Sequence, residues 1–474
     1  MDYNFDSCIN WTGYIKVKVK KKMKNSNLPI AILGFGKTGL SIAKYLYSNK
    51  RDFVVYDTRE NLIVTEEIKK NINLKKIVLG KFKNNYIENH DNFIFSPGVA
   101  LKKKFLNRIR SEKKNVQTYI DIFYEKIKKN IICVTGSNGK TTVTLLTEYV
   151  LKYLGKNAKA CGNIGIPVLD IINKKYDYYV IELSSFQLEM TKRIRSRVSL
   201  ITNITADHLD RHKTLKNYAK IKHNIFKNSK KTIINRSDKK ILHKYKYSFG
   251  FDEPKDMNSF GIKKIDKEYF IYQGEKKLFS EKDVKLIGQH NLINICASLA
   301  IMKSLGLNIK KSIEGIKAFN PVVHRMENFI NQDSISWIND SKATNIDSTI
   351  SAINSLENEI ILIIGGRSKT NNYKKLDSAI KKKVKYLIIF GEAKSLLNKK
   401  IQSIKNKIIV KDLENAVEVV DEIIYKRGNF IKKKINIILS PACSSFDMFS
   451  NYEERGEYFK RCVLSYLKKK KYEK

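Results

Sequence analysis

The sequence lacks closely paired cysteines. No Cys-x-x-Cys pair occurs, and the six cysteines are scattered: Cys8, Cys133, Cys161, Cys296, Cys443 and Cys462. This spacing predicts neither a zinc site nor a disulfide framework, and it is typical of a protein from the reducing cytosol. Because Cys133 and Cys443 lie in apolar runs, we expect both thiols to be buried.

Long apolar runs are also missing. No stretch approaches the roughly 18 apolar residues that a membrane helix needs, and the first 27 residues have no apolar core of the signal-peptide kind. We therefore expect no membrane insertion and a cytoplasmic location. Residues 1–27 are polar and basic, so we expect a disordered, dispensable extension in which Met23 is a second possible start.

Acidic residues are scarce relative to basic ones. Lys and Arg number 91 against 47 Asp and Glu, which gives a net charge of +44 over 474 residues. Such a balance would usually favour nucleic acid or an anionic membrane. The lysines are spread along the whole chain, however, and no basic motif is interleaved with aromatic residues. We expect no nucleic-acid partner, although a basic surface would attract phosphorylated substrates.

A phosphate-binding loop occupies the centre of the sequence. An apolar strand from residue 131 runs into a glycine turn and a helix expected from Val143. The two glycines let the backbone aim its N–H groups at an anion, a lysine adds a point charge, and a threonine hydroxyl suits Mg²⁺. The residues expected to bind ATP here are Gly136, Ser137, Asn138, Gly139, Lys140, Thr141 and Thr142.

This loop is shorter than the usual P-loop, because Val134 stands where a further glycine would be. The plain alternative is a chance Gly-Lys-Thr in a lysine-rich chain. The strand–turn–helix context favours nucleotide binding.

A second glycine turn lies nearer the amino end. Residues 29–33 predict a buried strand, residues 34–39 read GFGKTG, and Asp57 ends the next strand. This is a Rossmann-like βαβ pattern, which alone favours NAD(P) and a dehydrogenase. A third strand at residues 92–95 ends in Ser96-Pro97-Gly98, where ligands bind in open α/β sheets.

Two polar residues follow strands that could flank the strand of the phosphate loop. Glu182 ends a strand that begins at Tyr179, and His208 follows one that begins at Val198. A carboxylate and an imidazole near the outer phosphate would suit a Mg²⁺ site. The alternatives are a solvated strand end and a surface histidine.

Strands alternating with helical stretches beyond residue 322 predict a third, mostly parallel α/β region. The fold class is therefore α/β with three domains. They are a Rossmann-like domain at 28–120, a central ATPase-like domain at 121–321 and a Rossmann-like domain at 322–474.

In this order the motifs resemble the Mur ligases of peptidoglycan synthesis over nearly all of residues 28–465. The motif TGSNGKTT is shared with the wider group that includes folylpolyglutamate synthases. The pieces GFGKTGLS, DTR, IELSSFQLE, DHLDRH, NDSKATN and LSPACSSFDMF are more specific. Residues 340–345 resemble the members that add D-glutamate, because their sister ligases carry an Asp-x-x-His pattern there.

The resemblance implies an ATP-dependent ligase that joins D-glutamate to UDP-N-acetylmuramoyl-L-alanine through an acyl phosphate, with ATP and two Mg²⁺ ions. We also expect a monomer, although no motif of the sequence bears on the oligomeric state. It implies that Lys140 stabilises the migrating phosphoryl group and that Thr141, Glu182, His208 and a carbamylated Lys222 hold the metal ions. The further ATP-binding residues it implies are Asn294, Arg325, Asp340 and Lys342.

The resemblance also divides the substrate contacts. It assigns the UDP-linked substrate to Gly34, Phe35, Lys37, Thr38, Asp57, Thr58, Arg59, Ser96, Gly98, Asn163, Ser184 and Gln187. It assigns D-glutamate to Thr344, Lys369, Ser445 and Phe446. The plain alternative for the last pair is a helix cap at Ser445 with Phe446 in the core.

Three departures from the family pattern stand out. Arg367 replaces an expected Asp near Lys369, the segment from His208 to Lys222 is one residue short, and His223 is unusual beside Lys222. Residues 1–27 match nothing. The rivals are another Mur or folylpolyglutamate synthase-type ligase, a dehydrogenase, and a non-catalytic nucleotide-binding protein.

Overall fold

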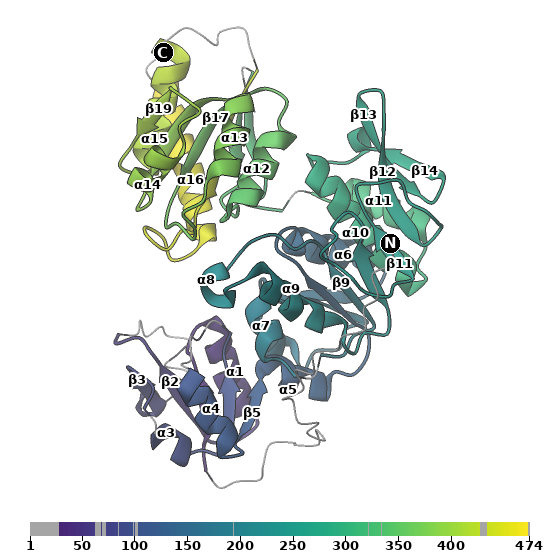
Figure 1. Cartoon of the computed structure of the whole chain (residues 1–474), viewed down its shortest axis with the longest axis vertical. Helices are drawn as coiled ribbons and strands as arrows, with labels where there is room; N and C mark the ends of the chain where they lie inside the picture. The colour runs from purple at the N-terminus through teal and green to yellow at the C-terminus, as the bar shows by residue number, and fades with distance from the viewer. Residues whose placement is uncertain are drawn as a thin grey trace, which may run out of the picture. The chain divides into compact units, whose positions relative to one another are not determined.

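Three separate sheets with accompanying helices make up the computed structural model of the chain (Figure 1). It describes residues 28–61, 68, 73–83, 85–97, 99, 103–192, 194–320, 322–332, 334–426 and 434–472. Both the expected extension 1–27 and Gly98 lie outside these residues. Within them, no helix is long and apolar enough to span a bilayer. The chain divides into two units between Ile122 and Phe123, and each is described by itself.

The first unit holds a five-stranded parallel sheet of order β3-β2-β1-β4-β5. Because β1 lies between β2 and β4, the strand order reverses there, which is where α/β sheets bind ligands. The predicted glycine turn is at this point. Its strands are β1 (Ile30–Leu33), β2 (Phe53–Asp57), β3 (Ile77–Leu79), β4 (Asn92–Phe95) and β5 (Asn115–Thr118), and its helices are α1 (Lys37–Ser48), α3 (Asn85–Glu88), α4 (Lys103–Ser111) and the start of α5 (Tyr119–Lys126).

The second unit begins with a nine-stranded sheet of order β14-β13-β12-β11-β10-β9-β6-β8-β7. Strands β6 to β12 pair with one another in parallel. Strand β13 pairs antiparallel with both β12 and β14. The strands are β6 (Ile131–Thr135), β7 (Ala158–Gly162), β8 (Tyr178–Glu182), β9 (Val198–Ile201), β10 (Thr232–Asn235), β11 (Tyr247–Phe249), β12 (Ser259–Ile265), β13 (Glu268–Gln273) and β14 (Lys276–Ser280). The helices are α6 (Lys140–Tyr153), α7 (Ser185–Met190), α8 (Leu209–His212), α9 (Leu215–His223), α10 (Gln289–Leu305) and α11 (Ile309–Ala318).

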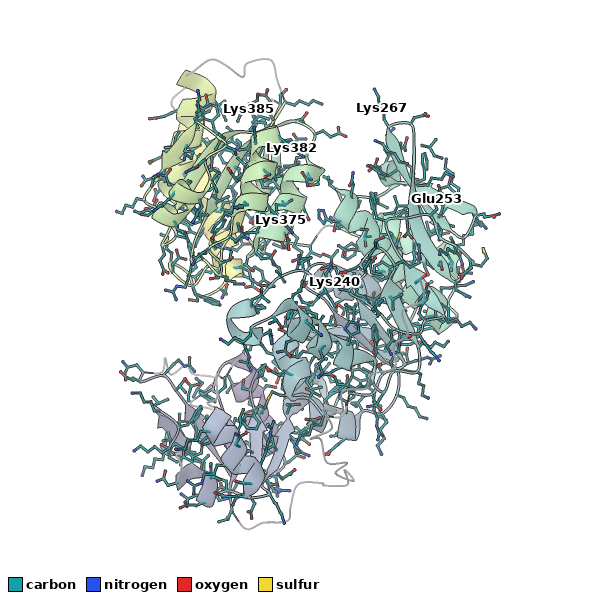
Figure 2. The ribbon with its side chains drawn as sticks, viewed as in Figure 1. Lys240, Glu253, Lys267, Lys375, Lys382 and Lys385 are labelled. Atoms are coloured by element: carbon teal, nitrogen blue, oxygen red, sulfur yellow. The ribbon has the colours of Figure 1, made fainter. Side chains whose placement is uncertain are left out.

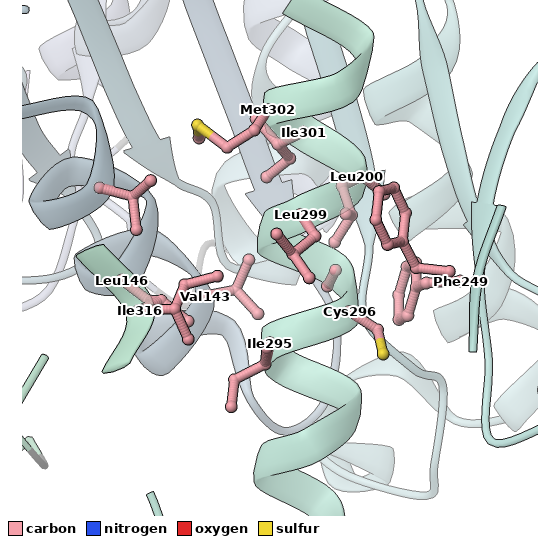
Figure 3. Packing of buried hydrophobic residues seen from close by; sticks show 14 of the residues in the cluster. Val143, Leu146, Leu200, Phe249, Ile295, Cys296, Leu299, Ile301, Met302 and Ile316 are labelled. Atoms are coloured by element: carbon pink, nitrogen blue, oxygen red, sulfur yellow. The ribbon is translucent and has the colours of Figure 1, made fainter. Parts of the chain in front are cut away.

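The core of this sheet forms around α6 and α10. Helix α10 is apolar on nearly every side, as expected for a helix buried between layers. Figure 3 shows its Leu299 and Ile295 near Val143 and Leu146 of α6, with Phe249 of β11 on the other side. This packing fixes α6, and with it the phosphate loop at its start.

A third sheet completes the second unit, with order β15-β16-β20-β17-β18-β19. Only β15 pairs antiparallel, which confirms the prediction of a mostly parallel region. Its strands are β15 (Glu327–Gln332), β16 (Ile335–Asn339), β17 (Glu359–Gly365), β18 (Val384–Phe390), β19 (Lys407–Ile409) and β20 (Ile435–Ala442), and its helices are α12 (Ile346–Ser355), α13 (Lys374–Lys383), α14 (Lys394–Lys400), α15 (Leu413–Asp421) and α16 (Tyr452–Tyr472). As predicted, Cys133 of β6 and Cys443 just after β20 are buried.

The excess lysines lie on the surface of separate segments. Lys240, Lys267, Lys375, Lys382 and Lys385 are all exposed, and Figure 2 shows them on several different elements. These five lysines therefore do not lie along one element.

Candidate active site

The phosphate loop joins β6 to α6, and the helix starts at Lys140, three residues earlier than predicted. Gly139 caps it in the left-handed conformation, with φ of 80°. Lys140 Nζ donates to Gly136 O at 2.9 Å and to Ser137 O at 2.8 Å. Burial lowers the pKa of Lys140, whereas the carboxylates of Glu182 and Asp207 act in the opposite direction.

Glu182 reaches this loop from the end of β8, which pairs directly with β6. Its Oε2 accepts from Thr141 Oγ1 at 2.8 Å, and its Oε1 accepts from Asn163 Nδ2 at 2.8 Å. The residue is only 2 % exposed, so the alternative of a solvated strand end is wrong. Strands β8 and β9 are the two neighbours of β6, which confirms that the strands carrying Glu182 and preceding His208 flank the phosphate loop.

Lys222 is buried on the other side of the loop. It comes from α9, is 1 % exposed, and its Nζ donates to Gly136 O at 2.7 Å. Burial, aided by the charge of Lys140, lowers its pKa well below the usual value, although Asp207 and Glu182 oppose this. The neighbouring His223 turns back to Ala219 O at 2.8 Å, so it takes no part in this cluster.

His208 lies at the start of α8 in a left-handed conformation with φ of 54°. Its ring lies at the edge of the Phe186 ring, with 4.9 Å between centroids. Its Nε2 is 3.6 Å from Asp207 Oδ2. The residue is half-buried, and it lines the same cavity as Lys140 and Lys222.

A cavity of about 250 Å³ opens beside the phosphate loop. Asn138, Gly139 and Thr142 line it together with three residues that the family resemblance implied: Asn294, Arg325 and Asp340. A Cβ on Gly139 would come 2.3 Å from Asn294 Oδ1, so only glycine lets α10 approach the loop this closely. Arg325 Nε is buried and has no hydrogen-bond partner among the described residues, which points to an anionic or acceptor ligand.

Two ionisable groups beside this cavity have shifted pKa values. Burial raises the pKa of Asp340 to about 7, although Ser440 and Arg325 act against the shift. Burial and the charge of Arg325 lower the pKa of Lys342 to about 7. Lys342 does not line the cavity, and its Nζ lies 4.5 Å from the centroid of the Tyr452 ring.

A second cavity, of about 390 Å³, brings together most of the residues expected around the reacting groups. Its walls come from the phosphate loop, from α7 to α9 and from the loops of the third sheet. The predicted residues among them are Lys140, Asn163, Ser184, His208, Lys222, Thr344, Lys369, Ser445 and Phe446. Cations at Lys140 and Lys369 and the hydroxyls of Thr344 and Ser445 suit a substrate with carboxylates.

The loops of the third sheet resolve two open questions. Phe446 is 64 % exposed, so the alternative that placed it in the core is wrong. Arg367 does not line the cavity, because its Nε and Nη2 both bond Glu392 Oε2 at 2.9 Å. Lys369 does line it, and its Nζ is 4.0 Å from Asp207 Oδ1.

The glycine turn of the first unit is held by Asp57. The carboxylate accepts from Phe35 N at 2.6 Å and from Arg59 Nε at 2.8 Å, while Arg59 Nη2 donates to Phe35 O at 2.8 Å. Ser96 follows β4, and its N–H donates to Leu33 O at 2.9 Å. Lys37, Thr38 and Thr58 are exposed or half-buried around this turn.

Ser184 and Gln187 form a capping box at the start of α7. Ser184 N donates to Gln187 Oε1 at 2.6 Å, and Gln187 N donates to Ser184 Oγ at 3.3 Å. The capping box is by itself a structural reason for a serine and a glutamine to occur three positions apart here. Their contact with the UDP-linked substrate stays a prediction.

Sequence reasoning missed several residues that line the two cavities. Asp207 faces Lys369, and its only signal was its place beside His208. Asn451, Tyr452 and Glu453 line the second cavity, but they come from the last helix and the residue before it. Asn291 and His290 line the first, and the helical pattern around Asn294 could have indicated them.

Protein-family models match residues from all three sheets. Residues 29–118 match the model of the Mur ligase MurD-like N-terminal domain, residues 134–302 the Mur ligase middle domain, and residues 324–431 the Mur ligase glutamate ligase domain. The chain is 36 % identical to the UDP-N-acetylmuramoylalanine–D-glutamate ligase of Coxiella burnetii, over 93 % of this chain and 99 % of that one. The chain belongs to the Mur ligase family.

Solved Mur ligases share the fold at lower identity. UDP-N-acetylmuramate-alanine ligase from Thermotoga maritima superposes with a TM-score of 0.61 at 19 % identity, over 92 % of this chain and 99 % of that one. MurF ligase from the same organism, solved in complex with ADP, gives 0.57 at 15 % identity over 94 % and 96 % of the two chains. The three sheets of this Mur ligase are therefore the fold of the family.

Proposed function

We propose that this Mur ligase joins D-glutamate to UDP-N-acetylmuramoyl-L-alanine in peptidoglycan precursor synthesis, converting ATP to ADP and phosphate. One observation carries the proposal. Lys140, the first residue after the phosphate loop, lines the same cavity as Lys369, and the bonded pair of Thr141 and Glu182 adjoins Lys140. Phosphoryl transfer and amino-acid capture would therefore take place in one chamber. The D-glutamate ligase from Coxiella burnetii, which matches over its full length, supports this choice of acceptor.

The reaction balances in two steps. The alanyl carboxylate attacks the γ-phosphorus of ATP, and the bond from that phosphorus to the leaving ADP oxygen breaks. The uncharged amine of D-glutamate then attacks the acyl carbon, and phosphate leaves with the electron pair of the C–O bond as the nitrogen gives up a proton. Lys140 lies at the phosphate loop, where its charge would stabilise the oxygens of the migrating group.

The residues beside the loop fit a magnesium–nucleotide complex. Mg²⁺ prefers oxygen ligands, and Thr141 Oγ1 and the Glu182 carboxylate lie together at the helix start. His208 would add an imidazole from across the cavity. A bound Mg²⁺ would neutralise charge on the phosphates. We place it on Thr141, Glu182 and His208.

Lys222 is suited to carbamylation. Carbon dioxide reacts with an uncharged amine, and the low pKa that burial gives Lys222 keeps a larger share of it uncharged. The ammonium first loses one proton. Addition of CO₂ to the uncharged amine then forms an N–C bond and releases a second proton, so that the cation beside Gly136 O is replaced by an anion. That anion would reduce the repulsion between Lys222 and Lys140 and could serve a cation.

Nucleotide contacts follow from the first cavity. Arg325, whose Nε is buried without a hydrogen-bond partner among the described residues, and Asn294 line it together with Asn138 and Gly139 of the phosphate loop. We assign Arg325, Asn294, Asp340 and Lys342 to ATP. We assign residues 28–120 to the uridine end of the substrate, with Gly34, Phe35, Lys37, Thr38, Asp57, Thr58, Arg59, Ser96 and Gly98, and residues 322–474 to D-glutamate.

The acceptor tests this function most sharply. Product formation from UDP-N-acetylmuramoyl-L-alanine, followed by mass spectrometry, should occur with D-glutamate and not with L-glutamate or a diamino acid. Lys369→Ala should raise the KM for D-glutamate roughly ten- to a hundredfold, the effect of one lost charge-assisted contact, and leave the KM for ATP nearly unchanged. Because Arg367 is paired with Glu392, Arg367→Ala is the matched control and should change neither. Equal rates with both glutamate enantiomers would refute the proposed acceptor.

A further inference from the structure

Arg455 is a fully buried cation on α16, with 0 % exposure. Among the described residues, the acceptors that its guanidinium bonds are all neutral oxygen atoms. Nε donates to Ser341 Oγ at 3.0 Å, Nη2 donates to Ser341 O at 2.8 Å and to Cys443 O at 3.2 Å, and Nη1 donates to Cys443 O at 3.2 Å and Gly365 O at 3.5 Å. Burial of an arginine with no carboxylate bonded directly to it is costly, and Asp447 acts on it only through its charge. These contacts therefore hold the surrounding loops.

The acceptors belong to three different segments. Ser341 follows β16, Gly365 ends β17 and Cys443 follows β20, and these three strands are neighbours in the third sheet. Each segment leads within a few residues to a group that we assign to the second cavity. Thr344 follows the first acceptor, Lys369 the second and Ser445 the third.

The close packing around the guanidinium leaves little freedom. A Cβ on Gly366 would lie 3.1 Å from Arg455 Nη1 and 2.3 Å from Ser444 O. Arg367 and Ser444 exchange backbone hydrogen bonds at 2.9 and 3.0 Å, so two of the three segments are also joined directly. The first segment is joined to the third as well, because Ala442 N donates to Ala343 O at 2.9 Å. Besides Arg455, it is attached to α16 by the bond from Ser341 Oγ to Tyr452 O at 2.9 Å and by the bond from Asn339 Nδ2 to Gly456 O at 3.3 Å.

A planar guanidinium can meet acceptors in several directions at fixed angles, whereas the ammonium of lysine is one compact charge. We propose that Arg455 is a positioning residue, which sets the three acceptor-site loops against one another and thereby places Thr344, Lys369 and Ser445 for D-glutamate. This inference rests on the proposed function. Arg455 lines neither cavity, so it acts through the loops and not on the substrate.

Arg455→Lys tests this role, because it keeps a basic side chain and removes the planar guanidinium with its several donors. We expect the KM for D-glutamate to rise at least tenfold. The KM for ATP should rise less, since one of the three loops carries Asp340 and Lys342, and the KM for the UDP-linked substrate should stay unchanged. Arg461→Lys, on the exposed side of the same helix, is the matched control and should behave as wild type.

A merely structural role would give a different pattern. Loss of folded protein lowers the apparent kcat and leaves every KM unchanged, and that result would overturn the inference. If Arg455→Lys does not fold, Ser341→Ala removes the Nε acceptor with the arginine in place. It should shift the same KM in the same direction by a smaller factor, and an unchanged KM would again overturn the role.

Hydrogen exchange separates this inference from the proposed function. In the enzyme without substrates, amides at residues 341–345, 366–369 and 443–446 should exchange faster in Arg455→Lys than in wild type, and amides of β6 and α6 should not. Unchanged exchange in all three loops would contradict the positioning role. A wild-type enzyme that forms no D-glutamate product would refute the function and leave this exchange result standing.

Discussion

The chain contains two glycine turns that look alike in sequence and differ in what their neighbours deliver. Both connect a buried strand to a helix that starts with Lys-Thr, at Lys37 in the first unit and at Lys140 in the second. In both helices the N-cap residue is a glycine, so no N-cap side chain bonds the first N–H groups of the helix. Local sequence alone would give them the same ligand.

The strand next to each turn supplies an acidic side chain, and the two acids bond different groups of their turns. In the first turn, Asp57 from β2 points its carboxylate at the loop amide of Phe35, the group that a phosphate would otherwise use. In the second, Glu182 from β8 bonds the hydroxyl of Thr141 instead, and Lys140 folds over the loop carbonyls. The loop amide of the first turn is therefore already occupied by an acid, whereas in the second turn the acid bonds a hydroxyl and leaves the loop amides to an anion.

Lys140→Ala and Lys37→Ala should give the largest difference in kinetics between the two turns. Loss of Lys140 removes a preorganised charge, which is worth on the order of 3 kcal/mol or more in a transition state, so kcat should fall at least about a hundredfold. Lys37→Ala should leave kcat unchanged and raise only the KM for the UDP-linked substrate. Steady-state kinetics with each substrate varied in turn measures both. Wild-type kcat in Lys140→Ala would show that the loop does not act in phosphoryl transfer.

Gly136→Ala and Gly36→Ala separate the turns by backbone. Gly136 has φ of 151°, and a Cβ there would lie 1.8 Å from Thr202 Oγ1, whereas a Cβ on Gly36 meets nothing within 4 Å. A residue held in such a conformation costs about 1–3 kcal/mol. We expect Gly136→Ala to lower the unfolding free energy by that amount and to weaken ATP binding, with Gly36→Ala close to wild type in chemical denaturation. Equal stabilities would mean that the loop relaxes freely.

Asp57→Asn sharpens the assignment of the first turn. The carboxylate accepts from Phe35 N and from Arg59, and an amide keeps its shape but loses the charge. Since hydrogen bonds to charged groups contribute about 1.5–3 kcal/mol, the KM for the UDP-linked substrate should rise roughly tenfold or more. The KM values for ATP and D-glutamate should not change. A rise in the KM for ATP alone would move nucleotide binding to this turn.

A pH dependence of stability should also differ between Asp57 and Asp340. Burial alone would raise the pKa of Asp57, but the hydrogen bonds from Arg59 and Phe35 lower it overall. Its stabilising contribution is therefore present above the ordinary pKa and lost as pH falls. Asp340 is the reverse, because burial raises its pKa to about 7 from 3.8. The folded form loses stability as pH rises between those two values.

Asp340→Asn should consequently gain unfolding free energy relative to wild type as pH rises from about 4 to 7, and the gain should level off above that. Asp57→Asn should instead lose stability at neutral pH and approach wild type in acid. Urea denaturation at several pH values compares the two. A pH-independent difference for Asp340→Asn would show that its carboxyl group is not shifted in the folded state.

The parts of the fold that depend on local pattern could be predicted from the sequence. The strand of the phosphate loop, its glycine turn and the strands carrying Glu182 and leading to His208 have clear apolar runs, and parallel topology brings strand ends together. The antiparallel strands β12 to β14 were not anticipated, because their sequences, SFGIKKI, EYFIYQ and KKLFS, have neither a continuous apolar run nor a strict alternation of apolar and polar residues.

Other parts of the site depend on contacts between distant segments. Lys222 is one lysine among many in the sequence, and only the family resemblance marked it, since its burial comes from packing. Tyr452 and Glu453 reach the second cavity from the last helix, more than 300 residues after the phosphate loop. The hydrogen bonds of Arg455 join strands whose order in the sheet no local spacing reveals.

The measurement that tests the central claim most directly is the rate of ADP release with each substrate left out in turn. The account predicts sustained ADP release only when UDP-N-acetylmuramoyl-L-alanine and D-glutamate are both present, with one amide product formed for each ADP. Sustained ADP release without D-glutamate, or ADP release at the full rate with neither substrate, would contradict the claim that phosphoryl transfer and D-glutamate binding take place in one cavity.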